Sequence, residues 1–321
     1  MTEALSRLAP ASETVEVSGT GAPVLAGTRR SSSTRRRRTT RRVLLWLALV
    51  VIALVMAAPF LWMFLTAVRS QQELYSADMT FWPQQWHWEN FATALDTAPF
   101  LIYARNSFTI ALVHCLSNLV LGSMCGYALA KLRFRGSTIV FAFILASMMI
   151  PFYAIVIPEF LMVRYVPLAG GNDLFGQGGS GWIDTWPALL VPALVSPFNI
   201  FLFRQFFVGT PTELIEAARI DGAGEVRIFA RIMAPLIRPG MLTVALLAFE
   251  AGWNNFLWPL IVTTSTEMRV IQVGLSVFRQ EAGTQFNLLM AGTTMAAVPM
   301  IILFAFFQRH FVNGMVASGI K

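Results

Sequence analysis

The stretch TPTELIEAARIDGAGEVRIFARIMAP, at residues 210–235, is charged and helical in pattern and lies between two long apolar runs. Thr210 is expected to cap a helix, because Pro211 suits the first helical position and Glu213 completes a capping box. Gly222 stands where a left-handed residue would end that helix. The stretch therefore predicts a short helix that stops at a defined turn.

A second helix is expected to start near Gly224, directly after this turn. Four apolar residues recur at helical spacing on its predicted face: Phe229, Ile232, Met233 and Leu236. On the first helix, Glu216 and Arg219 have the spacing of a weak ion pair. A helix, a turn and another helix between apolar runs indicate a docking element; a surface helix lying on a membrane is the alternative.

The composition places the chain in a membrane, because 56% of its residues are hydrophobic and only 13% are charged, against about 25% in soluble domains. Six apolar runs reach roughly 20 residues, the length that crosses a bilayer as a helix. They cover residues 43–66, 106–130, 138–162, 186–207, 239–262 and 288–307. Pro151 and Pro158 predict kinks in the third run. The predicted fold is an all-α membrane protein with six transmembrane helices.

Residues 1–42 form a polar tail that is too poor in apolar residues to fold, so we expect it to be disordered. Its arginines, concentrated in residues 29–42, are expected to orient the chain and attract anionic lipid headgroups. Most of the 24 Lys and Arg residues fall in this tail and in alternate loops. The positive-inside rule then places both termini in the cytoplasm, and residues 210–235 become a cytoplasmic loop between spans four and five. This distribution explains the net charge of +7 without nucleic acid.

Chemistry that would supply energy or catalysis is missing from the sequence. There is no nucleotide-binding motif, no catalytic constellation and no metal-ligand spacing among His87, His114 and His310. Glu250, near the middle of span five, is the exception and leaves an ion-coupled carrier as one alternative. The glycine-rich residues 169–181 are expected to form a flexible outer loop that touches a partner or ligand.

The order Glu216-Ala217-Ala218-x3-Gly222, followed after nine residues by Ile232-x-Ala234-Pro235, resembles the EAA signature of inner-membrane permease subunits of ABC importers. The wider run ELIEAARIDGA is similar to the carbohydrate-uptake branch, in particular the smaller maltose-type permease. Other segments agree, namely NSFTIAL, GYALAKLRFRG, MIPFYAIVIP, IFLFRQFF, WNNFLWPL and QRHFVNG. Ala234 replaces the family's Leu, Glu250 replaces an apolar residue, and residues 169–181 exceed the usual connection.

This resemblance implies a permease domain over residues 43–321, in a bacterial inner membrane, that imports a sugar and is not itself an enzyme. It implies a second permease chain, two ATPase subunits that bind ATP and Mg, and an external solute-binding protein. No cofactor or metal is expected on this chain. The residues implied to contact an ATPase subunit are Glu216, Ala217, Ala218, Asp221 and Gly222.

Residues of span five are candidates for the solute path, because sugars are held by aromatic stacking and by amide and carboxylate hydrogen bonds. The candidates are Glu250, Trp253, Asn254 and Asn255. The first three are expected to share one helix face. Polar contacts between helices are the alternative role for these side chains. Polyols or glycerol phosphate esters are the alternative substrates, and a secondary carrier using Glu250 is the alternative mechanism.

Overall fold

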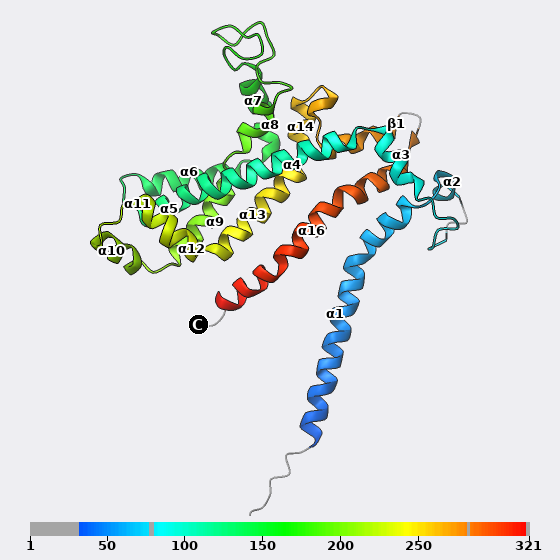
Figure 1. The fold of residues 1–321 in the computed structure, drawn as a ribbon, viewed down its shortest axis with the longest axis horizontal. Helices are drawn as coiled ribbons and strands as arrows, with labels where there is room; N and C mark the ends of the chain where they lie inside the picture. The colour runs from blue at the N-terminus through cyan, green and yellow to red at the C-terminus, as the bar shows by residue number, and fades with distance from the viewer. Residues whose placement is uncertain (1–31, 77–79, 281–282, 319–321) are drawn as a thin grey trace, which may run out of the picture. The chain divides into compact units, whose positions relative to one another are not determined.

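The computed structural model describes residues 32–76, 80–280 and 283–318, and their regular secondary structure is almost entirely helical (Figure 1). The chain divides into two units, one up to Ala57 and one from Ala58 onward. In the first half of the chain the helices are α1 (Ser32–Ala67), α2 (Gln71–Leu74), α3 (Glu89–Thr97), α4 (Phe100–Ser117), the π-helix η1 (Asn118–Gly122), α5 (Ser123–Lys131), α6 (Ser137–Met149) and α7 (Phe152–Arg164).

The second half of the chain has shorter elements and more breaks. They are α8 (Trp186–Leu190), η2 (Val191–Ala193), α9 (Pro197–Val208), α10 (Glu213–Ile220), α11 (Glu225–Ile228), η3 (Phe229–Met233), α12 (Ala234–Leu236), α13 (Arg238–Trp253), α14 (Leu257–Val262), η4 (Thr266–Met268), α15 (Ile271–Gly274), η5 (Leu275–Phe278) and α16 (Phe286–Ser318). Two short strands, β1 (Arg279–Gln280) and β2 (Gly283–Thr284), pair antiparallel. The all-α prediction therefore misses one small ladder, because two residues per strand are too few to show a period of two.

Four helical segments are long and apolar enough to cross a membrane, namely Arg41–Ala67, Phe100–Lys131, Trp186–Val208 and Phe286–Gln308. Two further segments qualify if each bent pair of helices counts as one span. They are Ser137–Met149 with Phe152–Arg164, bent by 105°, and Glu225–Leu236 with Arg238–Val262, bent by 85°. The described residues thus contain four to six candidate spans, and each predicted apolar run overlaps one of them.

Proline acts differently at its two positions in the third apolar run. The chain bends at Ile150 and Pro151, as predicted, because Pro151 has no backbone N–H and disfavours helical backbone in the residue before it. The helix α7 continues through Pro158, where the sequence predicted a second kink.

The helix α1 begins inside the stretch predicted as a tail, residues 1–42. Residues 1–31 lie outside the described residues, but α1 is already helical from Ser32. Extending a helix costs less than starting one, so an apolar span can propagate into the arginine run that precedes it. Within the first unit, every side chain from residue 41 to residue 57 is exposed.

Close packing in the second unit depends on small residues where helices cross. Helix α4 packs along α13, and α5 packs along α9. A Cβ atom on Gly252 would lie 2.6 Å from Cα of Ala111, and one on Gly126 would lie 2.5 Å from Cβ of Phe203. Helices in lipid associate through such close backbone approach, because lipid is as apolar as their side chains.

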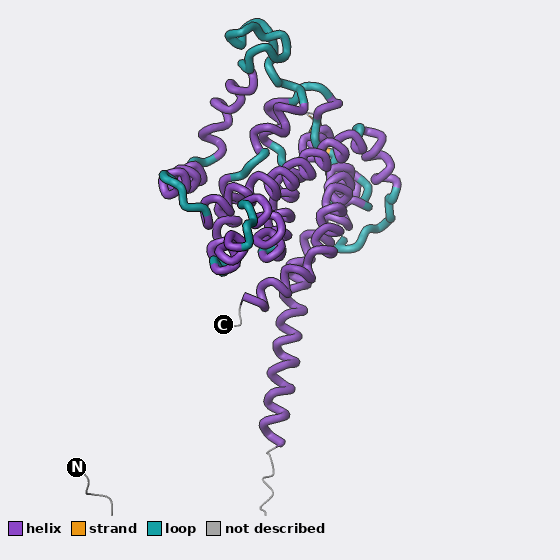
Figure 2. The backbone as a smooth tube through the Cα atoms, turned by 60° about the vertical axis from the view of Figure 1, so that its left-hand side comes forward, coloured by secondary structure: helices purple, strands orange, loops and turns teal. Residues whose placement is uncertain are grey.

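The loop that follows α7, residues 165–185, is drawn in teal at the top of Figure 2. Polar side chains that bind backbone groups hold this loop. Asn172 is buried and donates to the carbonyls of Arg164 and Val166, while its own Oδ1 accepts from Gly179 N–H at 2.8 Å. Asn172 therefore ties residues 169–181, which the sequence predicts to be a flexible outer loop, to the end of α7.

Asp184 joins the segment before α8 to the segment after α14. Its Oδ1 accepts from the N–H groups of Thr264 and Ser265 at 2.9 and 3.0 Å. Burial raises the pKa of Asp184, but the hydrogen bonds from Ser265 and Thr264 together outweigh burial, so the pKa lies below its usual value. The carboxylate is therefore ionised at neutral pH and holds both segments.

We predict that Gly252→Leu destabilises the protein by about 3 kcal/mol, the upper end for overpacking, because the added atoms meet backbone. The measurement is the midpoint of thermal unfolding in detergent. Ala251→Leu is the matched control, since Ala251 is exposed in this chain. Equal midpoints for the two variants would contradict close packing of α4 on α13.

Candidate coupling helix and solute cavity

Helix α10 has one buried face and one exposed face. Ile215 and Ala218 are 1% and 7% exposed and belong to a core cluster that includes Tyr127 and Phe207. Glu216 and Ala217 are exposed on the opposite side. Of the two adjacent alanines of the signature, Ala217 is therefore open to a partner, whereas Ala218 is packed inside this chain.

The capping box predicted at Thr210 is wrong. Thr210 ends α9 instead, because its N–H and its hydroxyl both donate to the carbonyl of Phe207. Helix α10 begins at Glu213, and the carbonyl of Thr212 accepts from the N–H groups of Ile215 and Glu216. A proline disfavours helical backbone in the residue before it, so Pro211 separates Thr210 from α10.

The turn after α10 follows the prediction. Gly222 has a φ of +77°, and its N–H donates to the carbonyl of Arg219 at 3.0 Å. Ala223 N–H closes the turn on the carbonyl of Ala218 at 2.9 Å. The exposed Asp221 precedes this glycine. Nothing lies within 4 Å of a Cβ atom built on Gly222, so its backbone conformation alone favours glycine.

Arg219 does not pair with Glu216. Its guanidinium binds Glu225 instead, with Nη2 2.7 Å from Oε1. Since Glu225 starts α11, this ion pair bridges the turn, which spacing along a single helix could not reveal. The pair is nearly half exposed, so its net stabilisation is about 1 kcal/mol or less.

The second helix of the loop changes phase at η3. The π-helical turn leaves Leu236 exposed and buries Ile237 in its place. A π-helical turn inserts an extra residue and so rotates the following residues around the helix. The predicted face is therefore correct at Met233 and wrong at Leu236. The chain bends at Ile237, two residues beyond Pro235.

A cavity of about 600 Å³ opens between α4, η1, α7, the segment around η2, and α13. Its polar lining consists of His114, Asn118, Glu159, Ser196, Asn199, Glu250 and Asn255. Phe152, Phe198 and Trp258 supply aromatic surface. The lining contains two carboxylates and no Lys or Arg among the described residues. Such a mixture of ring faces, amides and carboxylates suits a ligand with hydroxyl groups.

Only part of the predicted solute path reaches this cavity. Glu250 and Asn255 line it. Asn254 instead donates from Nδ2 to Glu250 Oε1 at 2.8 Å and accepts from Gln272 at 3.1 Å. Asn254 therefore fixes the rotamer of the Glu250 carboxylate at the end of α13.

Trp253 does not share a face with Glu250, so that prediction is wrong. It is 2% exposed, stacks on Phe249 and donates from Nε1 to the carbonyl of Ala296 at 3.1 Å. A buried indole N–H needs an acceptor, and this one finds it on α16. Trp253 is a packing residue between α13 and α16.

Asn118 and Asn199 both line the cavity, but neither was identified as a site residue from the sequence. The Asn118 amide donates to the His114 carbonyl, and its Oδ1 accepts from Ser196 N–H at 2.8 Å and Asn199 Nδ2 at 3.0 Å. The sequence contains a signal for them, because polar residues inside an apolar span usually mark function or helix contacts. His114 and Asn118 are also one turn apart.

Comparison with known proteins places this arrangement in a family. Residues 118–316 match the family described as "Binding-protein-dependent transport system inner membrane component". The chain belongs to this family of permeases. The match covers residues 210–235, most of α16 and the cavity lining from Asn118 onward, so α10 and all of the cavity lining except His114 lie within the matched residues.

Two relatives and one solved structure show the range of similarity. The permease is 36% identical over 273 residues to the arabinooligosaccharides transport system permease protein AraQ of Halalkalibacterium halodurans, covering 84% of this chain and 93% of that protein. It is 28% identical to the sn-glycerol-3-phosphate transport system permease protein UgpE of Yersinia pestis, covering 84% and 94%. A crystal structure of a bacterial ABC transporter that imports alginate has the same fold, with a TM-score of 0.67 at 23% identity over 88% and 98% of the two chains.

The permease should tolerate bulk at Ala217 and reject it at Ala218. Ala218→Leu is expected to cost about 1–3 kcal/mol, because the larger side chain enters a packed cluster. Ala217→Leu should leave stability unchanged, because that position is exposed. Trypsin cleavage after Arg219 and Arg227 in the detergent-solubilised protein measures whether the loop opens. Similar cleavage rates for the two variants would contradict the assigned faces.

Proposed function

We propose that this permease is one of two membrane chains of an ABC importer for a neutral sugar, and that α10 docks in a separate ATPase subunit. The observation that supports this most directly is the two-sided burial of α10. Ile215 and Ala218 fix the helix to its own chain, while Glu216 and Ala217 remain exposed. Asp221 and the Gly222 turn complete the docking surface.

The proposed assembly contains a second, related permease chain, two ATPase subunits and an external solute-binding protein. ATP and Mg bind to the ATPase subunits, and this chain supplies neither cofactor sites nor hydrolysis. In the bacterial inner membrane, each bent helix pair counts as one span. The chain then crosses six times, with both termini and α10 in the cytoplasm and the arginine-rich tail, residues 1–42, against lipid headgroups.

A sugar fits the cavity better than a glycerol phosphate ester does. Glu159 and Glu250 place two carboxyl groups in the lining, and no described Lys or Arg lines the cavity to balance the charge of a phosphate. Hydroxyl groups can donate to both carboxyl groups and to the amide oxygen of Asn255, while the aromatic lining can pack against a sugar ring. The higher identity to an arabinooligosaccharide permease than to a glycerol phosphate permease supports the same choice.

An ion-coupled carrier is the second mechanism to test. Its one support is Glu250 within α13. That carboxylate already accepts a hydrogen bond from Asn254, which suits a fixed ligand contact. Affinity purification separates the two mechanisms, since an importer subunit should bring an ATPase with it and a carrier should transport without one.

Ala217→Leu is expected to abolish coupled uptake while the protein inserts and folds normally, because it changes only the exposed docking face. Gly222→Pro should have the same effect on uptake through the turn, since proline cannot adopt a φ of +77° and lacks the N–H that binds Arg219. The measurements are ATPase recovery and uptake in proteoliposomes. Normal sugar-stimulated ATP turnover with Ala217→Leu would refute the docking role.

Glu250→Leu is expected to lower the maximal uptake rate of arabino-oligosaccharide about tenfold, the scale of one lost hydrogen bond to a charged group. Glu250→Gln keeps an oxygen for Asn254 and should lose about threefold or less. Glycerol 3-phosphate should not compete in either case. Competition by glycerol 3-phosphate in the unmodified transporter would favour the alternative substrate class.

A further inference from the structure

We propose that Tyr127 and Lys131 of α5 are positioning residues that transmit the position of α10 to the cavity. This inference rests on the proposed docking of α10 and adds the route by which docking reaches the solute. The two side chains are one helical turn apart, at the end of α5 that faces the coupling loop.

Lys131 holds the loop before α10. Its Nζ donates to the carbonyl of Thr210 at 2.7 Å, directly after the end of α9. It also lies 3.4 Å from the hydroxyl of Thr212, which immediately precedes α10. The entry to α10 is thus attached to α5 through a charge-assisted hydrogen bond.

Tyr127 holds the loop after α10. Its ring is 4% exposed and packs against Phe207 and Phe229, with ring centroids 5.5 Å apart in both cases. Its hydroxyl donates to Oε2 of Glu225 at 2.9 Å. Packing fixes the ring, so the hydroxyl holds Glu225 at a defined position.

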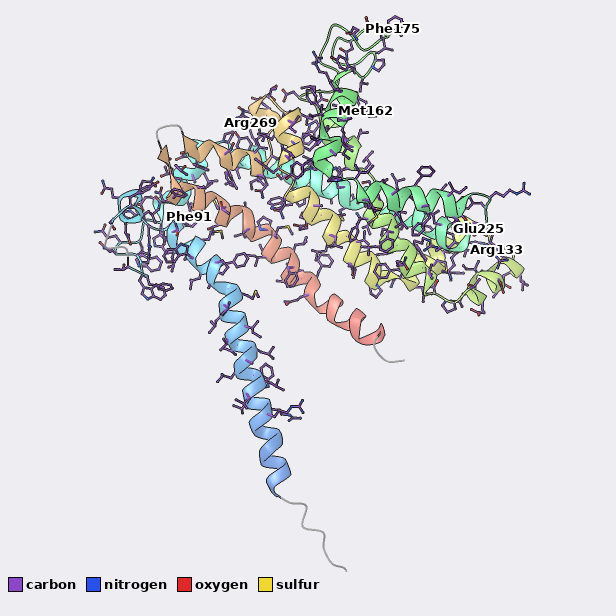
Figure 3. The ribbon with its side chains drawn as sticks, turned by 180° about the vertical axis from the view of Figure 1, so that it is seen from behind. Phe91, Arg133, Met162, Phe175, Glu225 and Arg269 are labelled. Atoms are coloured by element: carbon purple, nitrogen blue, oxygen red, sulfur yellow. The ribbon has the colours of Figure 1, made fainter. Side chains whose placement is uncertain are left out.

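Glu225 connects this contact to α10 itself. Its Oε1 binds Arg219 of α10, while its Oε2 accepts from Tyr127 of α5. Figure 3 shows Glu225 near Arg133, at the end of the bundle remote from Phe175. A displacement of α10 therefore acts on α5 at both ends of the coupling helix.

The opposite end of α5 leads to the cavity. Helix α5 continues from η1, whose first residue, Asn118, lines the cavity and holds Ser196 and Asn199. Nine residues separate Asn118 from Tyr127, about 14 Å of helix. Because α4, η1 and α5 form one continuous helical segment, a shift at Tyr127 is carried to Asn118 without crossing a loop.

The test uses the complete transporter, with both permease chains, the ATPase subunits and the binding protein presented with arabino-oligosaccharide. Tyr127→Phe removes only the hydroxyl. It should leave ATPase recovery unchanged and reduce sugar-stimulated MgATP hydrolysis about tenfold, the scale of one hydrogen bond to a carboxylate. Lys131→Met should act in the same way, and Lys131→Arg should restore most of the activity because it can donate to the same carbonyl.

Two matched variants serve as controls. Tyr153→Phe removes a hydroxyl from a tyrosine that is 79% exposed, and Arg133→Met removes an exposed charge two positions after Lys131. Both should behave as the unmodified protein does. Tyr127→Phe combined with Glu225→Ala should lose no more than Glu225→Ala alone, because both changes break the same contact.

Unchanged stimulation in Tyr127→Phe, or losses that multiply in the double variant, would overturn the transmission role. Loss of ATPase subunits from the Tyr127→Phe complex would also overturn it, by assigning the residue to assembly. Failure of the unmodified permease to retain any ATPase would instead refute the proposed docking function.

Discussion

The amide of Asn118 satisfies the constraint on which this fold most depends, namely that backbone polar groups within a membrane need partners inside the protein. Proline residues around η2 interrupt the helical segment 186–208 and expose N–H and carbonyl groups. Asn118 binds two of these backbone groups: its Oδ1 accepts from Ser196 N–H, and its Nδ2 donates to the Ala193 carbonyl. The same side chain lines the cavity. One residue therefore both pairs backbone groups where the helix is interrupted and contributes to the polar lining of the proposed solute site.

The permease core also requires that its helices approach closely. Gly252 lets α13 pack against α4, and Gly126 lets α5 pack against α9. Asn118 lies in η1, between α4 and α5. The resulting frame joins three sites with different chemistry. The cavity has carboxylates and amides, the coupling helix has an exposed alanine and glutamate, and Tyr127 with Glu225 forms a polar contact between them. Asn118 and Tyr127 lie on one helical segment, Phe100–Lys131, with no loop between them.

Much of the fold follows from sequence because its signals are local. Length and apolarity mark the spans, Pro151 marks a bend, and Gly222 marks a left-handed turn. The error at Thr210 is local, because Pro211 separates Thr210 from the next helix and Thr210 closes α9 on Phe207. The other errors arise from contacts outside a single helix, as where Arg219 binds Glu225 across the turn. Trp253 turns toward Ala296 on α16, a partner more than forty residues away that helical spacing cannot identify.

The sequence by itself determined that this chain is a helical membrane protein with a short helix that ends in a turn at Gly222, because hydrophobic length and backbone preference are properties of neighbouring residues. Only the tertiary structure decided which side of that helix is free. Ala217 and Ala218 are adjacent and chemically identical, yet one is exposed and the other is buried against Phe207 and its neighbours. The difference arises from packing against α5 and α9, which local sequence does not contain.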